Sequence, residues 1–192
     1  MPAHFDERDR ARIRAKLLAT GRELFVAQGL RKTSLAELTE PAGIAKTSFY
    51  AFFDSKESLY GELMLANAPA VQARVLATLD GEPRAAIRAF LREVLAVLDE
   101  DPLYRRLITH PEELAAVTAR LSPERAAALR EQAALPIGEF LARTGLDGRR
   151  PEVVLGVLRA VLLLPLHRNE FGEVYDEVVD QLVEFVASGL SR

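Results

Sequence analysis

Residues 33–59, TSLAELTEPAGIAKTSFYAFFDSKESL, decide the fold of the N-terminal part of this chain. Ser34 and Glu37 have the spacing of a capping box, which predicts the start of a short helix. Gly43 then falls in a turn, and a second short helix is expected over residues 45–52. Two short helices joined by a glycine-containing turn are typical of a helix-turn-helix unit.

The helical period continues on both sides of this stretch. Apolar residues recur at helical spacing over residues 8–28, and Gly29 is placed to end that helix. Residues 54–57 form another helix cap, followed by a helical pattern that reaches residue 79. Further helices are predicted at 84–98, 103–109, 112–121, 123–143 (kinked at Pro136), 152–168 and 175–190. No segment alternates like a strand, so the chain is predicted to be all-α with about nine helices.

Composition and charge narrow the class of protein. The chain has 192 residues, 49% of them hydrophobic and 28% charged, and no cysteine, which predicts a folded chain without disulfides or thiolate sites. The net charge is −3, but residues 1–56 hold ten basic and seven acidic side chains, including all four lysines. A basic segment on an acidic remainder indicates an end that binds a polyanion, although a chance excess of a few charges gives the same numbers.

Seven polar residues of the helix-turn-helix segment are candidate DNA contacts. Hydroxyl groups and free N–H groups at the start of a helix can bind phosphate, and side chains on the first turn of a recognition helix meet base edges. A phenol can hydrogen-bond the DNA backbone, and a lysine near the start of the next helix adds positive charge. The candidates are Thr33, Ser34, Lys46, Thr47, Ser48, Tyr50 and Lys56.

Three segments resemble the DNA-binding signature of the TetR (tetracycline-repressor-like) family: residues 33–38 (TSLAEL), 42–50 (AGIAKTSFY) and 53–59 (FDSKESL). The resemblance covers roughly the first third of the chain. It implies a DNA-binding domain over residues 1–55 and a helical effector-binding and dimerisation domain over residues 56–192. It further implies a repressor that leaves its operator when a small molecule binds.

Two positions depart from the pattern of the family. Ala45 stands where a serine is common, and the missing side-chain acceptor costs a helix about 1 kcal/mol. Pro41 follows Glu40 and is expected to move that residue away from helical backbone angles, which would distort the turn.

The last two predicted helices are candidates for a dimer interface. The helix over residues 152–168 is apolar almost all round, so it must be covered on several sides. Pairing it and the final helix with their symmetry mates would give a four-helix interface that matches a palindromic operator. A fully buried helix in a monomer is the alternative. The expected interface residues are Leu155, Leu158, Leu162, Leu166, Val178, Val179, Leu182 and Val186.

The resemblance implies an effector cavity among the fifth to eighth helices. Such cavities are mostly apolar with a few polar groups. The candidates are Phe90, Tyr104, Thr109, His110, Phe140, Arg159 and His167, and a residue of this kind is more often a core or surface residue than a ligand contact. The pair His167 and Glu170 has no third ligand, and no phosphate loop or nucleophile elbow is present, so no metal, cofactor or catalytic site is predicted.

The sequence therefore predicts a ligand-responsive regulator that acts as a homodimer on double-stranded operator DNA. The alternative is an all-α interaction or scaffold protein without specific DNA binding. The N-terminus lacks the apolar segment of a signal peptide, and no apolar run reaches the length that spans a bilayer, so a cytoplasmic protein without a membrane partner is expected.

Overall fold

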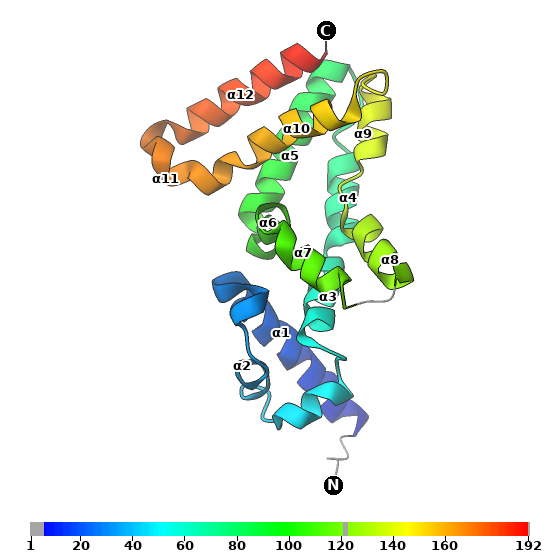
Figure 1. The fold of residues 1–192 in the computed structure, drawn as a ribbon. Coiled ribbons are helices and arrows are strands. Elements are labelled where there is room, and N and C mark those ends of the chain that lie inside the picture. Colours follow the sequence, from blue (N-terminus) through cyan, green and yellow to red (C-terminus); the bar gives the residue numbers. More distant parts are fainter. Residues whose placement is uncertain (1–5, 121–122, 192) are drawn as a thin grey trace. The chain divides into compact units, whose positions relative to one another are not determined.

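The computed structural model describes residues 6–120 and 123–191, and within these residues every regular element is a helix (Figure 1). The predicted all-α class is confirmed. The elements are α1 (Glu7–Lys32), α2 (Leu35–Thr39), η1 (Lys46–Ala51), α3 (Lys56–Ala66), α4 (Ala68–Leu76), α5 (Pro83–Glu100), α6 (Pro102–Thr109), α7 (Pro111–Thr118), α8 (Pro123–Ala133), α9 (Ile137–Arg143), α10 (Pro151–Leu162), η2 (Leu164–His167), α11 (Arg168–Phe171), η3 (Gly172–Val174) and α12 (Tyr175–Leu190). The η elements are short 3-10 helices.

Several predicted helices are divided in the structure. The pattern over residues 56–79 forms α3 and α4, which separate at Asn67. The predicted kink at Pro136 separates α8 from α9, because proline lacks the N–H that would continue the helical hydrogen bonds. The apolar helix over residues 152–168 ends as α10 at Leu162 and continues as η2, which contains Pro165.

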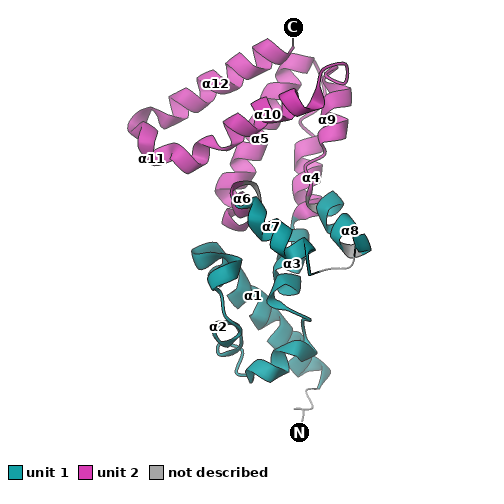
Figure 2. Cartoon of the chain, in the orientation of Figure 1, with its two compact units in different colours: residues 1–67, 110–133 teal, residues 68–109, 134–192 magenta. Residues whose placement is uncertain are grey.

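The chain forms two compact units (Figure 2). Unit 1 combines the described residues of 1–67 and 110–133, and unit 2 combines residues 68–109 with the described residues of 134–192. Unit 1 is larger than the predicted DNA-binding domain of residues 1–55, because α3 and α7 pack on α1, and α8 packs on α3 and α7. The functional division at residue 55 stays a prediction.

The core of unit 1 is built by the close approach of α1 and α3. Phe25 and Tyr60 are buried and meet edge to face, with ring centroids 4.9 Å apart. Gly21 makes this approach possible, since a Cβ atom there would lie 2.5 Å from Cδ2 of Leu59. The helical backbone of α1 is interrupted at Gly29, whose φ of 80° and ψ of 169° confirm the predicted end of the first regular helix.

The core of unit 2 is centred on α5, whose long apolar face packs against α4, α10 and α12. Fully buried side chains of α5 include Ile87, Phe90, Leu91 and Val94. Exposed arginines at the edge of this face pair with carboxylates of α12, with Arg88 2.9 Å from Glu184.

Among the described helices, none combines the length and the apolar character that crossing a bilayer requires.

Candidate nucleic-acid interface

The N-terminus of α2 is held by the predicted capping box. The Ser34 N–H donates to Oε2 of Glu37 at 2.8 Å, and the Ser34 hydroxyl donates to the same oxygen at 2.7 Å. The Glu37 N–H in turn donates to the Ser34 hydroxyl oxygen at 3.3 Å. The hydrogen bonds from Ser34 lower the pKa of Glu37. The start of α2 is therefore stabilised within the protein, with the exposed Ser34 at its tip.

The residue before Pro41 keeps helical backbone angles, so the predicted effect of Pro41 on the turn after α2 is wrong. Glu40 has φ −57° and ψ −49°, inside the right-handed helical region. The Glu40 N–H still donates to Ala36 at 2.9 Å, and the Glu40 carbonyl accepts from Gly43 at 3.0 Å. These hydrogen bonds outweigh the preference that a following proline imposes. Gly43 then reverses the chain with φ 67°, a conformation that disfavours residues with a side chain.

The segment after the turn forms the 3-10 helix η1 in place of an α-helix. Ala45 lies at its N-terminus without a side-chain hydrogen bond, as the sequence predicts. Side chains three residues apart are aligned in a 3-10 helix, so Thr47 and Tyr50 form one row. Tyr50 is 59% exposed, and Lys46 and Thr47 are also exposed, whereas Ser48 is half-buried. The exposed edge of η1 (Lys46, Thr47 and Tyr50) thus presents an ammonium group, a hydroxyl and a phenol.

The inner side of η1 is fixed to the core of unit 1. Phe49 is fully buried and packs on Phe53, with ring centroids 5.8 Å apart. Arg10 donates to the carbonyl of Ala51 at 3.0 Å, and its guanidinium lies 5.4 Å from the ring centroid of Phe52. An arginine of α1 therefore holds the C-terminal end of η1, which gives the exposed edge of η1 a rigid base.

Thr33 and Lys56, two predicted DNA contacts, make hydrogen bonds inside unit 1. Thr33 is buried, and its hydroxyl donates to the carbonyl of Gly29 at 2.8 Å. The Lys56 ammonium donates to the carbonyls of Leu30 and Thr33, both at 2.8 Å, and to that of Arg31 at 3.3 Å. The sequence contains a signal for this arrangement, because Gly29 ends the helix and leaves carbonyl groups that a nearby lysine can bind.

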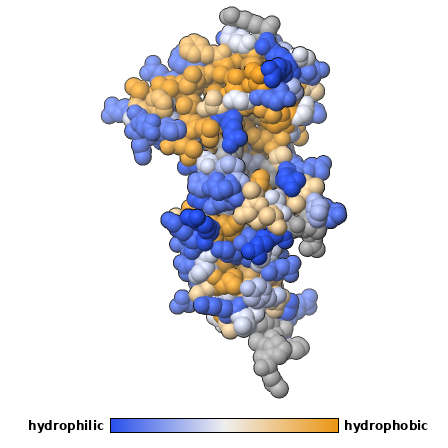
Figure 3. Space-filling model, in the orientation of Figure 1, coloured by the Kyte–Doolittle hydropathy of each residue, from blue (hydrophilic) through white to orange (hydrophobic). Residues whose placement is uncertain are grey.

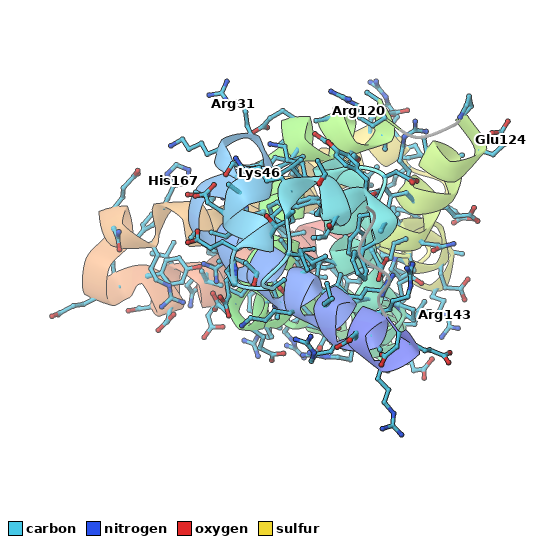
Figure 4. All side chains as sticks on the ribbon, turned by 90° about the horizontal axis from the view of Figure 1, so that it is seen from below. Arg31, Lys46, Arg120, Glu124, Arg143 and His167 are labelled. Carbon is cyan, nitrogen blue, oxygen red and sulfur yellow. The ribbon has the colours of Figure 1, made fainter. Side chains whose placement is uncertain are left out.

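Two further basic residues lie immediately before α2. Arg31 and Lys32 are exposed, and Arg31 points away from the ribbon (Figure 4). They were not among the predicted contacts, although their position next to the Ser34 cap is visible in the sequence. They add positive charge beside the start of α2, the helix end that attracts anions.

The effector candidates fall into three places. Phe90 and Phe140 are fully buried in unit 2 with ring centroids 4.3 Å apart, and Tyr104 is buried in the same core. Burial of the phenol, together with the charge of Asp101, raises the pKa of Tyr104 to about 12. Of the other candidates, Arg159 and His167 are exposed on α10 and η2, and Thr109 and His110 are half-buried at the ends of α6 and α7. The structure brings together only the three aromatic residues, which we call the aromatic cluster (Phe90, Tyr104 and Phe140).

The predicted interface residues divide between the core and the surface of unit 2. Leu158 and Leu162 are buried, Leu155 and Leu166 are exposed, and the four from α12 (Val178, Val179, Leu182 and Val186) are half-buried. Exposed apolar residues that the sequence did not single out are Val153, Val174 and Phe185, at 53%, 54% and 66%. Figure 3 shows hydrophobic side chains gathered over the region of α10 and α12. We call Val153, Leu155, Leu166, Val174 and Phe185 the exposed apolar face of unit 2, and exposed apolar side chains that gather in this way often mark an interaction surface.

Acidic and histidine side chains are the groups of this chain that could bind a metal. His167 and Glu170 do contact each other, at 3.0 Å between Nδ1 and Oε1. No group of three or more such side chains comes together within the described part of the chain. His167 and Glu170 therefore form an exposed contact between residues three positions apart.

Comparisons with known proteins agree with the helix-turn-helix geometry. The sequence model of the family "Bacterial regulatory proteins, tetR family" matches residues 17–63, which include α2 and η1. The HTH-type transcriptional repressor KstR2 of Rhodococcus jostii (strain RHA1) is 41% identical over 51 residues, which is 27% of this chain. The match spans only 25% of that repressor.

Two solved structures resemble the whole fold. The TetR family transcriptional regulator PfmR of Thermus thermophilus has a TM-score of 0.60 and 25% identity, over 92% of this chain and 100% of that one. The structure of AibR in complex with isovaleryl coenzyme A and operator DNA has a TM-score of 0.65 and 18% identity, over 91% and 97% of the two chains. The capped α2, the glycine turn and the exposed η1 edge all lie within residues 17–63, the segment that matches the TetR family of bacterial regulatory proteins.

Proposed function

We propose that this chain is a ligand-responsive DNA-binding transcriptional regulator, a repressor that occupies a palindromic operator as a homodimer. The observation that carries the proposal is the exposed edge of η1, where Lys46, Thr47 and Tyr50 face solvent on a rigidly held segment. Hydroxyl and ammonium groups suit base edges and phosphates of the major groove. DNA lies in the bacterial cytoplasm, so the proposal also implies a cytoplasmic location.

The contacts are proposed to divide by role. Thr47 and Ser48 read base edges from the first turn of η1, and Lys46 and Tyr50 contact base edges or phosphates beside them. Ser34, with Arg31 and Lys32 next to it, binds phosphate at the start of α2. Thr33 and Lys56 contribute by holding the backbone of this region, since their polar groups already have partners in the protein.

The exposed apolar face of unit 2 is the proposed dimer interface. Two copies of α10 and α12 would form a four-helix contact related by a two-fold axis. Leu155 and Leu166 remain in the proposed interface and Val153, Val174 and Phe185 join it, whereas Leu158 and Leu162 support it from the core. A two-fold dimer presents two η1 segments to half-sites about 34–36 Å apart or a multiple of this spacing.

The effector is proposed to bind in unit 2 beside the aromatic cluster. An effector lowers operator affinity only if it binds the DNA-free conformation more tightly than the DNA-bound one. Isovaleryl coenzyme A, the ligand of the AibR structure, is a suitable first probe because the two folds agree over most of both chains.

A mobility-shift titration against the DNA upstream of the gene for this chain tests the proposal. Wild-type protein should retain a specific duplex more tightly than a scrambled duplex, and its affinity should fall steeply with salt. Tyr50→Ala and Lys46→Ala should each weaken specific binding by roughly tenfold with unchanged melting temperature, because both side chains are exposed. Arg150→Ala, an exposed basic residue of unit 2, is the charge-matched control and should bind as wild type.

Two results would contradict the proposal. Equal retention of specific and scrambled duplexes would remove the sequence-specific function, and an absence of retention at low salt would favour the all-α scaffold alternative. Binding that is equally weakened by Arg150→Ala and by Lys46→Ala would show that general charge, and not the edge of η1, carries it.

A further inference from the structure

A buried carboxylate of α7 holds the turn that precedes the DNA-binding helices. Glu113 is 8% exposed. Its Oε1 accepts from the Leu30 N–H at 3.1 Å, and its Oε2 accepts from the Tyr60 hydroxyl at 2.7 Å. Burying a carboxylate is costly unless hydrogen bonds satisfy it, so this contact is specific in its geometry. All three residues belong to unit 1.

The α1–α2 turn, residues 29–34, is the element that Glu113 holds. Gly29 leaves helical geometry there, and Ser34 starts α2. Lys56 binds carbonyl groups of this turn, and Glu113 binds one of its N–H groups. The turn is therefore fixed by a cation from α3 and an anion from α7, which together determine where α2 begins.

The position of α7 on unit 1 is fixed by close packing as well. Val117 is fully buried, and a Cβ atom built on Gly61 of α3 would lie 3.3 Å from its Cγ1 atom. Gly61 thus lets α7 approach the backbone of α3 closely. Because α7 and α3 are closely packed, a displacement of α7 would move Glu113 relative to the α1–α2 turn.

The chain enters α7 directly from unit 2. The last residue of α6 is Thr109 in unit 2, the first residue of α7 is Pro111 in unit 1, and His110 alone lies between them. Proline fixes its own φ and restricts the residue before it. Unit 2 is therefore joined to α7 through a single residue.

We infer that Glu113 is a positioning residue for DNA binding, which holds the α1–α2 turn in the arrangement that lets α2 and η1 meet DNA. The inference rests on the proposed function. When α7 is seated, Glu113 holds Leu30 and the start of α2 in the DNA-binding arrangement. When the hydrogen bond to Leu30 is lost, the turn loses one of its two supports.

Amide hydrogen exchange and operator binding, measured on the full chain, test the inference. Glu113→Ala should raise the exchange rate of the Leu30 amide by about tenfold, because the N–H loses its buried acceptor. Exchange in α5 of unit 2 should stay as in wild type. Affinity for the upstream duplex that wild-type protein binds in the mobility-shift experiment should fall by about tenfold. The affinity is measured well below the melting temperature of the variant, where the variant is folded.

Two variants separate positioning from general stability. Glu113→Gln keeps an oxygen for Leu30 and an amide that can donate to the Tyr60 oxygen, so it should stay within about twofold of wild type in exchange and affinity. Leu129→Ala shortens a buried side chain of α8 in the same unit and should lower the melting temperature, while changing Leu30 exchange and DNA affinity much less than Glu113→Ala does.

The outcomes separate this inference from the proposed function. Unchanged Leu30 exchange in Glu113→Ala overturns the inference, and so does an equal loss of DNA affinity in Leu129→Ala. If wild-type protein retains no duplex, the proposed function fails, and the exchange rates still decide whether Glu113 holds the turn. If wild-type protein binds and Glu113→Ala binds equally well, the inference alone fails.

Discussion

The Nζ atom of Lys56 lies 2.8 Å from the carbonyl oxygen of Thr33, and this contact ties the start of α3 to the residue before α2. The same ammonium also donates to the carbonyl of Leu30. A lysine whose position in the sequence matches a DNA contact therefore has a structural role in the free protein. The DNA-binding surface depends on this internal contact because it sets the path of the chain into α2.

Salt dependence distinguishes the role of Lys56 from that of Lys46. Lys46→Met removes an exposed charge and should reduce the slope of log affinity against log salt by about 1. Lys56→Met should lower the melting temperature and the affinity but leave that slope unchanged, because its ammonium already binds carbonyl groups. Mobility-shift titrations at several salt concentrations measure both slopes. An equal reduction of the slope in the two variants would mean that Lys56 contacts phosphate in the complex.

A side-chain cap on η1 should stabilise unit 1. Ala45 has the extended backbone of an N-cap residue, with φ −68° and ψ 150°, but no side-chain acceptor. Ala45→Ser should raise the free energy of unfolding by about 1 kcal/mol, measured by urea denaturation. Ala51→Ser at the other end of η1 is the control and should give no gain, since a hydroxyl there has no free helical N–H to bind. Equal changes in both variants would contradict the capping argument.

The exposed apolar face of unit 2 should control the oligomeric state. Phe185→Asp places a charge on a side chain that is 66% exposed, so it should convert a dimer into monomers with little loss of folding stability. Sedimentation velocity measures the change. Leu158→Ala is the complementary variant, because this side chain is buried and its loss should cost about 2–5 kcal/mol of stability while the dimer persists. A dimer that survives Phe185→Asp would place the interface elsewhere.

Alkaline pH should destabilise unit 2 through Tyr104. Burial raises the pKa of this phenol from 10.0 to about 12, so the folded state favours the neutral form. The stability that this preference contributes is complete below pH 10 and is lost as the pH rises through about 12, a loss of about 2–3 kcal/mol. Tyr104→Phe should lack this step when unfolding is measured against pH. The same alkaline loss in wild type and in Tyr104→Phe would assign it to other groups.

Local signals of the sequence predicted local structure well. The Ser34 and Glu37 capping box, the break at Gly29 and the division of the helix at Pro136 are all present. The final helix was predicted over residues 175–190, which are the bounds of α12. Such features are closed by hydrogen bonds between residues a few positions apart, or by the geometry of a single glycine or proline, so the sequence around them is sufficient.

The apolar pattern of residues 152–168 did not predict which side of the helix is buried in the protein. It indicated a helix that must be covered on several sides, yet it did not say which stripe would face the protein. Packing against α5 and α12 buries Leu158 and leaves Val153 exposed. The effect of Pro41 on Glu40 was predicted wrongly for a similar reason, since the hydrogen bonds of the whole turn outweighed a preference between neighbours.

By itself, the sequence determined the helical class, the helix-turn-helix segment and the match of that segment to a family of regulators, because these depend on helix caps, turns and a motif within some thirty residues. Only the tertiary structure decided the partners of individual side chains. It assigned Lys56 to the α1–α2 turn, Glu113 to Leu30 and Tyr60, and Phe185 to the surface. These contacts join residues 23 to 83 positions apart or depend on which helix face is covered. Such pairings are set by the packing of whole helices, which no local pattern of residues specifies.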